Sequence, residues 1–159
     1  MREIILDTET TGLDPNMGHR LVEIGAVELI NHTPTGVNYQ TYINPERDVD
    51  PGAQEIHGLT NEFLKQHPVF GDISAEFMNF LSDSTLIIHN APFDLAFINM
   101  ELSRLGVTPI SSERVIDTLV LARKKFPGAQ ANLDALCRRF AIENRHRELH
   151  GALADAALL

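Results

Sequence analysis

The fold is decided by a short stretch near the start of the chain, Glu3-Ile4-Ile5-Leu6-Asp7-Thr8-Glu9. Its apolar run predicts a strand buried inside a sheet, and two carboxylates follow where that strand ends. Residues two apart on a strand point to the same face, so we expect Asp7 and Glu9 to present their carboxylates together. A polar pair that simply ends a strand would give the same pattern, so this pair needs support from the rest of the chain.

Around this first strand, the pattern predicts one sheet with helices packed against it. Further strands are expected at residues 21–29 and 37–43, and three strands so close in sequence suggest an antiparallel start to the sheet. The remaining apolar spacing predicts, in order, a helix around 73–81, a strand at 85–88, a helix from Pro92 to near Gly106, a strand at 115–116, a helix at 118–125 and a helix capped by Asn132. The fold class is therefore α/β, with a single domain over residues 1–159.

The composition of the 159 residues is that of an ordinary globular protein, with 43% hydrophobic and 22% charged residues. No stretch approaches the ~18 consecutive apolar residues of a membrane span, and the first strand leaves no room for a leader, so a cytoplasmic location is expected. The formal net charge of −9 argues against broad binding to the nucleic-acid backbone. Two basic stretches, 123–125 and 138–147, could offset it near a substrate entrance or be solvated helix faces. The single cysteine, Cys137, lies on an apolar stripe and is expected in the core.

A second polar signature, residues 89–94, follows the predicted strand at 85–88. Its histidine and Asn90 lie at the carboxyl end of a strand, a usual place for active-site groups in α/β proteins. With Pro92 at the first helical position, Asp94 falls in the first turn, where the helix dipole favours its charge even without a function. A hydrogen-bonded histidine and a capping Asn90 would fit this stretch as well.

The third signature lies near the end of the sequence, at residues 150–155. Residues five apart are about 140° apart around an ideal helix, so His150 is expected in a loop before a helix that carries Asp155. That helix would be about two turns long, and we expect it to be truncated or completed by a partner. His150 could deprotonate a water near neutral pH; a surface histidine and a solvated aspartate are the alternative.

Together the three signatures supply four carboxylates and a histidine: Asp7, Glu9, Asp94, Asp155 and His150. Carboxylate oxygens suit Mg²⁺ and Mn²⁺, and two such ions can clamp the attacking and leaving oxygens of a phosphodiester. Four carboxylates in one pocket would repel one another unless cations neutralised them, so the metal-free protein should gain stability when metal is added. The inventory predicts a two-metal phosphodiester hydrolase.

The three signatures, in this order and spacing, resemble the DEDDh branch of the DnaQ-like exonucleases. The likeness runs further, to the proofreading epsilon subunits of bacterial DNA polymerase III, and covers essentially the entire chain. It is carried by residues 6–12, 22–28, 56–58, 126–128, 133–137 and 149–153. The family fold is an RNase H-like mixed sheet whose first three strands are antiparallel. The reaction that the resemblance implies is 3′–5′ exonuclease action on DNA, which releases 5′-mononucleotides from a 3′ end.

The resemblance implies how the carboxylates would share the work. Asp7, Glu9 and Asp155 would bind the metal that activates water, and Asp7 would also touch a second metal beside the leaving oxygen. Asp94 would complete the set, directly or through water. His150 resembles the general base of the family, and the two ions would be Mg²⁺ or Mn²⁺.

The resemblance also implies contacts with the terminal nucleotide. The small residues 10–12 could let the backbone approach a nucleotide closely, although a turn built on Gly12 would explain them equally well. His57 resembles a nucleotide contact of the family, and a structural loop histidine is the alternative. The expected substrate-binding residues are Asp7, Glu9, Thr10, His57 and Asp155.

The partners expected by resemblance are a single-stranded or frayed DNA 3′ end, the polymerase III alpha subunit and a theta-like small subunit. Epsilon subunits carry a further tail that contacts the polymerase subunit and the sliding clamp; this sequence does not include it, so no contact with either through that tail is expected. Two alternatives remain open. One is an RNA-directed exoribonuclease of the same family, oligoribonuclease-like or RNase T-like, which would differ in how its pocket treats a 2′-hydroxyl. The other is a catalytically silent binding module.

Overall fold

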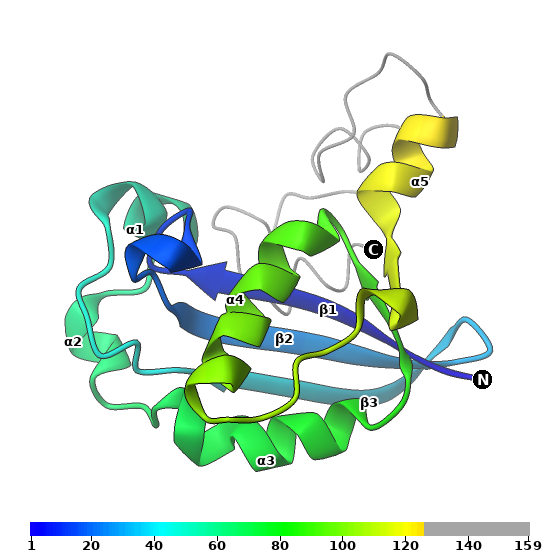
Figure 1. The fold of residues 1–159 in the computed structure, drawn as a ribbon, viewed down its shortest axis with the longest axis horizontal. Coiled ribbons are helices and arrows are strands. Elements are labelled where there is room, and N and C mark those ends of the chain that lie inside the picture. The colour runs from blue at the N-terminus through cyan, green and yellow to red at the C-terminus, as the bar shows by residue number, and fades with distance from the viewer. Residues whose placement is uncertain (126–159) are drawn as a thin grey trace.

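A mixed five-stranded sheet organises residues 1–125, which are the residues that the computed structural model describes (Figure 1). β1 (Arg2–Thr10) is the central strand in the order β3-β2-β1-β4-β5. On one side of it, β2 (Leu21–Ile30) and β3 (Thr33–Tyr42) run antiparallel. On the other, β4 (Thr85–Ile88) and β5 (Val115–Asp117) run parallel. The α/β class and the antiparallel arrangement of the first three strands are confirmed.

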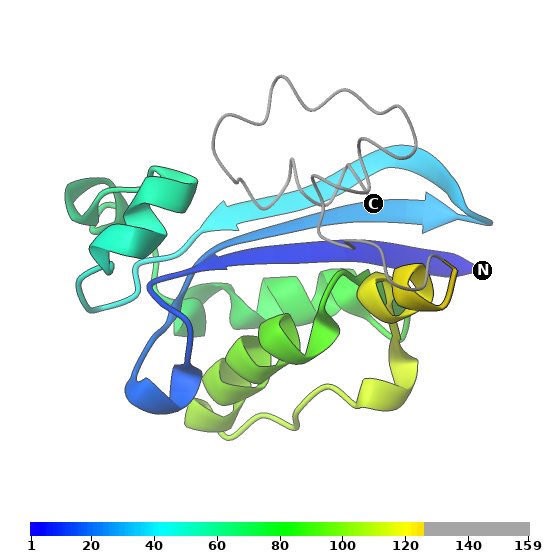
Figure 2. The same ribbon diagram turned by 90° about the horizontal axis from the view of Figure 1, so that it is seen from above.

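Two long helices, α3 (Phe70–Leu81) and α4 (Ala91–Arg104), cover the same face of the sheet (Figure 2). Their apolar sides form the main core with alternate residues of β1, Ile4 and Leu6. Ile5 points the other way and packs with Leu29 in a smaller cluster. Because side chains alternate along a strand, Asp7 and Glu9 share the face of Ile5 and lie opposite α3 and α4.

The segment between β3 and α3 contains two helices that the sequence pattern did not predict. They are α1 (Pro51–His57) and α2 (Asn61–Leu64), and both lie at the carboxyl end of β1 (Figure 1). Further along the chain, α5 (Thr118–Lys125) follows β5 directly and spans the range predicted for it. Short 3-10 helices at Pro15–Met17 and Ser112–Arg114 complete the described elements.

Several element boundaries differ from the sequence pattern, among them the starts of β3 and α4. β3 begins at Thr33 instead of residue 37, and Gly36, expected to precede the strand, lies inside it with φ of +86°. Since β3 is an edge strand, it tolerates Pro34, which has no backbone N–H to donate. At α4, Pro92 occupies the second helical position, because Ala91 is the first.

Several expectations lie outside the described residues. These are the helix after Asn132 with Cys137, the basic stretch 138–147, His150, Asp155 and the extent of the single domain. Within residues 1–125, no helix is long and apolar enough to cross a membrane.

Candidate active site

The carboxylates of Asp7 and Glu9 lie at the carboxyl end of the central strand, where the sequence predicted them. Glu9 stands opposite Glu23 of β2 in the antiparallel register, and both side chains are buried. Two acidic side chains directly opposite each other make this end of the sheet acidic. Gln40 of β3 donates a hydrogen bond of 2.8 Å to Glu23 Oε2. Glu23 is a buried acidic neighbour that the sequence reasoning did not single out.

Asp94 reaches the same region from the first turn of α4. Asp94 is 3% exposed, and the Thr8 hydroxyl donates a hydrogen bond of 2.5 Å to its Oδ1. Backbone N–H groups of Thr8 and Asp94 also bond to it. Burial raises the pKa of the Asp94 carboxyl to about 7; these hydrogen bonds oppose the rise, and the Asp117 carboxylate adds to it. The Asp94 carboxyl of the metal-free protein therefore gains and loses its proton near neutral pH.

The amino end of α4 is held by a residue from another element. Asn90, the residue before the helix, has a left-handed backbone (φ 62°), and its side chain makes no capping hydrogen bond among the described residues. Asp117 of β5 takes its place: Oδ1 accepts from Asn90 N at 3.0 Å and Oδ2 from Ala91 N at 3.1 Å. His89 shares a 2.9 Å hydrogen bond with the Thr118 hydroxyl. The alternative of a hydrogen-bonded histidine is thus met here, and that of a capping Asn90 side chain is not.

A cavity of about 570 Å³ opens beside Glu9, at the end of β1. Its walls come from the end of β1, from the loop after it, from α1 and from α4, and most of its surface is apolar. It is lined by Thr8, Glu9, Thr10, Gly12, Leu13, Asp50, Pro51, Gly52, Ala53, Ile56, His57 and Phe93. Glu9, Thr10 and His57, three of the residues predicted to bind the substrate, therefore face one space.

His57, the last residue of α1, is buried and uses both ring nitrogens within the fold. The Leu59 N–H donates to Nδ1 at 3.0 Å, so Nε2 carries the proton and donates to the Thr10 carbonyl, also at 3.0 Å. Burial lowers the pKa of this imidazole, which is therefore neutral at pH 7. The histidine fixes the backbone at Thr10; a contact with a nucleotide stays a prediction.

Gly12 lies in the loop after β1, and neighbouring groups pack closely against its backbone. The Thr10 hydroxyl donates to the Gly12 carbonyl at 2.6 Å, and Thr11 is fully buried. A Cβ at Gly12 would lie 2.4 Å from the ring of His19. Gly12 is therefore needed for close packing beside the cavity.

The described residues bring together part of the predicted metal site. Asp7 and Glu9 meet on one strand end, and Asp94 is tied to Thr8 between them. Within residues 1–125, no group of three or more His, Cys, Asp and Glu side chains is placed to hold a metal ion. Asp155 and His150, predicted to complete the set, lie outside the described residues. Their roles, and those of Asp7, Glu9 and Asp94 as ligands, stay predictions.

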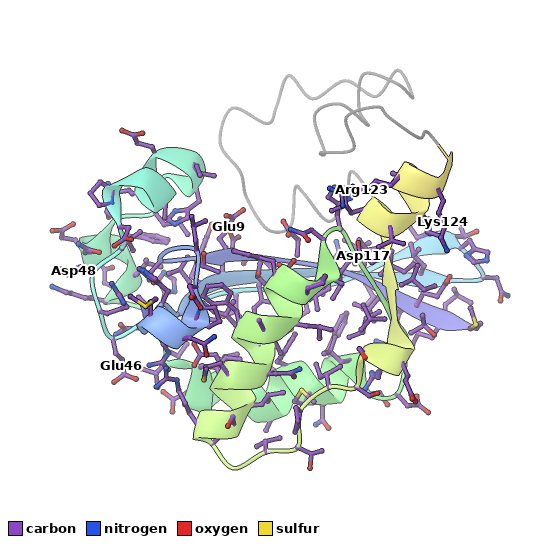
Figure 3. All side chains as sticks on the ribbon, turned by 45° about the horizontal axis from the view of Figure 1, so that its top comes forward. Glu9, Glu46, Asp48, Asp117, Arg123 and Lys124 are labelled. Carbon is purple, nitrogen blue, oxygen red and sulfur yellow. The ribbon has the colours of Figure 1, made fainter. Side chains whose placement is uncertain are left out.

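Charged residues are unevenly placed around this region. Figure 3 shows Glu9 and Asp117 on the two sides of the amino end of α4. Arg123 and Lys124 are exposed on α5, which begins next to Asp117, while Glu46 and Asp48 lie in the loop before α1. The predicted basic stretch 123–125 thus lies on α5, the helix that follows Asp117.

Comparison with known proteins assigns relatives to the whole chain. The model of the family described as Exonuclease, RNase_T, matches residues 4–159. The DNA polymerase III subunit epsilon of Rickettsia felis is 59% identical over 162 residues, which cover 100% of this chain and 71% of that protein.

Solved structures share the fold. Exonuclease X in complex with 5′ overhanging duplex DNA matches with a TM-score of 0.74 and 26% identity, covering 98% of this chain and 85% of that chain. The nuclease domain of 3′hExo, a DEDDh family member bound to rAMP, matches with a TM-score of 0.83 over 99% of this chain and 86% of that chain. At 18% identity, the second likeness concerns the fold alone. The predicted RNase H-like architecture is confirmed.

Proposed function

The chain belongs to the Exonuclease family, RNase_T, and we propose that it is a 3′–5′ exodeoxyribonuclease that proofreads for a replicative DNA polymerase. One observation carries the proposal: the 59% identity to a DNA polymerase III subunit epsilon extends over the whole chain. The geometry agrees with this assignment, because Glu9 at the end of β1 borders a cavity large enough for part of a nucleotide. The products would be 5′-mononucleotides.

Two divalent cations, Mg²⁺ or Mn²⁺, belong to the proposed site. Asp7, Glu9 and Asp155 would hold them, with Asp94 acting directly or through water. The chemistry of the donors fits, since carboxylate oxygens suit these ions and since Glu9 faces the buried Glu23. When bound, the ions would stabilise the charge that develops on the attacking and leaving oxygens.

The protein groups would position the substrate and move a proton. His150 would take the proton of the attacking water. The apolar walls at Ile56 and Phe93 would accept the terminal base, while Thr10 and His57 border the same cavity. Because Glu9 is also part of the cavity lining, a nucleotide seated there would place its phosphodiester near the carboxylates.

DNA is favoured over RNA as the substrate by the name of the relative, a subunit of a DNA polymerase. The same likeness supports a place in a DNA polymerase III assembly, with the alpha subunit and a theta-like small subunit as proposed partners. A role in bacterial replication implies a cytoplasmic location, because bacterial DNA is copied there. An RNA-directed enzyme of the same family and a silent binding module are the rival functions.

The test is metal-dependent degradation of a 3′-labelled single-stranded DNA oligonucleotide by the 159-residue chain, with Mg²⁺, Mn²⁺ or a chelator. His150→Ala and Asp7→Ala are assayed in parallel. Asp83→Ala is the matched control, because it removes an exposed carboxylate just before β4, at the opposite end of the strand from the site. An RNA oligonucleotide of the same sequence is the second substrate.

Release of labelled mononucleotide from DNA by the wild type and Asp83→Ala, lost in the other two variants, is the expected result. Asp7→Ala should keep its fold, because losing one carboxylate from a crowded acidic site relieves repulsion. Strong activity on RNA without activity on DNA would move the assignment to RNA processing. Inactivity on both would favour the binding module.

A further inference from the structure

Thr8 stands between the two carboxylates of β1 and points to the opposite face of the sheet. Asp7 and Glu9 share the face of Ile5, whereas Thr8 shares that of Ile4 and Leu6, against which α4 packs. Thr8 is 5% exposed, and its hydroxyl meets Asp94 Oδ1. One strand segment thus presents two carboxylates on one side and a hydrogen-bond donor on the other.

We propose that Thr8 is a positioning residue that holds the Asp94 carboxylate in the orientation needed for metal binding. This inference rests on the function proposed above and deepens it. Thr8 also lines the cavity beside Glu9, but in this proposal its hydroxyl is bonded to Asp94 and binds neither metal nor substrate. Its contribution is made through Asp94.

The hydrogen bond joins the two described parts of the predicted ligand set. Thr8 is covalently linked to Asp7, so holding Asp94 against Thr8 sets the separation between Asp94 and the strand carboxylates. The two partners are 86 positions apart in the sequence, so this bond connects α4 to β1. A metal site tolerates displacements of only about 0.5 Å, which makes such an anchor effective.

A buried carboxylate also needs hydrogen-bond donors wherever it points. The backbone N–H groups of Thr8 and Asp94 supply part of this need, and the Thr8 hydroxyl supplies a side-chain donor from another element. Ile4 and Leu6 on the same face are fully buried and apolar. A valine at position 8 would suit the strand and the apolar row as well as threonine does. What threonine adds is its hydroxyl, which donates to Asp94.

The experiment compares Thr8→Val, which removes the hydroxyl at nearly constant volume, with Thr8→Ser, which keeps it. Mn²⁺ affinity is measured by isothermal titration without DNA, and kcat and KM are measured on single-stranded DNA. We expect Thr8→Val to lose at least about tenfold in Mn²⁺ affinity and in kcat, as is usual when a group that orients a metal ligand is removed, with little change in KM. Thr8→Ser should recover most of both.

Wild-type Mn²⁺ affinity and kcat in Thr8→Val would overturn the proposal. A loss in Thr8→Ser as large as that in Thr8→Val would also overturn it, because packing of the methyl group would then be the cause. If circular dichroism shows that Thr8→Val does not fold, Thr8→Ala replaces it and is judged in the same way. A wild type that binds Mn²⁺ but leaves DNA intact would refute the proposed function, while the titration would still decide the role of Thr8.

Discussion

Gly12 follows the two threonines at the end of β1, and the ring of His19 leaves no room for a side chain there. That ring is fixed by a 2.8 Å hydrogen bond to the Thr11 hydroxyl and lies 3.4 Å from an Asp50 oxygen. Gly12→Ala should therefore lower the free energy of unfolding by about 1–3 kcal/mol, the usual cost of overpacking. Urea denaturation measures it.

Gly52→Ala is the matched control for Gly12→Ala. Gly52 lines the same cavity, but a Cβ there meets nothing within 4 Å among the described residues. Since Gly52 lies in α1, alanine should be neutral or should stabilise by up to about 1 kcal/mol. Equal costs for the two substitutions would contradict the packing argument.

His57 makes the stability of the metal-free protein depend on pH. Burial lowers its pKa in the folded state below the ordinary 6.5, so the unfolded chain binds a proton first as the pH falls. The neutral imidazole of His57 therefore stabilises the fold fully above pH 6.5. This contribution is lost as the pH falls from 6.5 to the folded-state pKa. Asp94, whose pKa is raised, gives a slope of the opposite sign.

The effect of His57 is isolated by comparison with His57→Gln, since Asp94 is present in both proteins. Urea unfolding between pH 5 and pH 8 should show the wild type losing more stability than the variant on the acidic side of about pH 6.5. Parallel curves over this range would show that the neutral imidazole is not required.

At the scale of elements, Asp117 caps a helix to which it does not belong. Asp117→Ala removes the acceptor for Asn90 N and Ala91 N, and also for Leu119 N in the first turn of α5, and should cost about 1–2 kcal/mol, as for other lost helix caps. Thermal unfolding at pH 5 is the suitable measurement. At that pH Asp94, with a pKa of about 7, is protonated, so relief of charge repulsion does not mask the lost cap.

Asn90→Gly is the companion variant. The Asn90 side chain makes no capping bond within the described part of the chain, and its φ of 62° suits glycine. We expect no loss of stability. A loss as large as that of Asp117→Ala would mean that the Asn90 side chain is the true cap.

The elements themselves differ in how far local sequence determined them. β4 and α5 match their predicted ranges, and α3 contains the predicted spacing, because apolar periodicity reports directly on burial. The short helices α1 and α2 escaped prediction because seven and four residues carry too little periodicity. The cap by Asp117 could not be foreseen either, since it depends on the pairing of β4 with β5.

At the scale of the whole molecule, metal should stabilise the fold. Mg²⁺ or Mn²⁺ would neutralise the carboxylates at the end of β1, and binding at 100 times the dissociation constant adds about 2.7 kcal/mol. The melting temperature should rise with Mn²⁺ in the wild type and in Asp83→Ala, and much less in Asp7→Ala. An unchanged melting temperature in the wild type would contradict the predicted metal site.

The site was predictable only in the parts that are local in sequence. Asp7 and Glu9 follow from strand alternation, and Asp94 from its place in the first turn of a helix. Glu23 matters because it lies opposite Glu9 in the sheet, and Thr8 because it bonds to Asp94, which is 86 positions away in the sequence. Contacts of this kind depend on topology, which no short motif reports.

The bond between Thr8 and Asp94 also bears on the order in which the molecule folds. β1, β2 and β3 follow one another closely and pair as hairpins, whereas β4 and α4 join β1 only after a long loop has closed. Distant contacts form more slowly than local ones, so we expect the three-stranded half to fold first. A newly made chain would then have its three-stranded sheet before it has a nuclease site. The late docking of β4 and α4 that completes the fold would also be the event that starts activity.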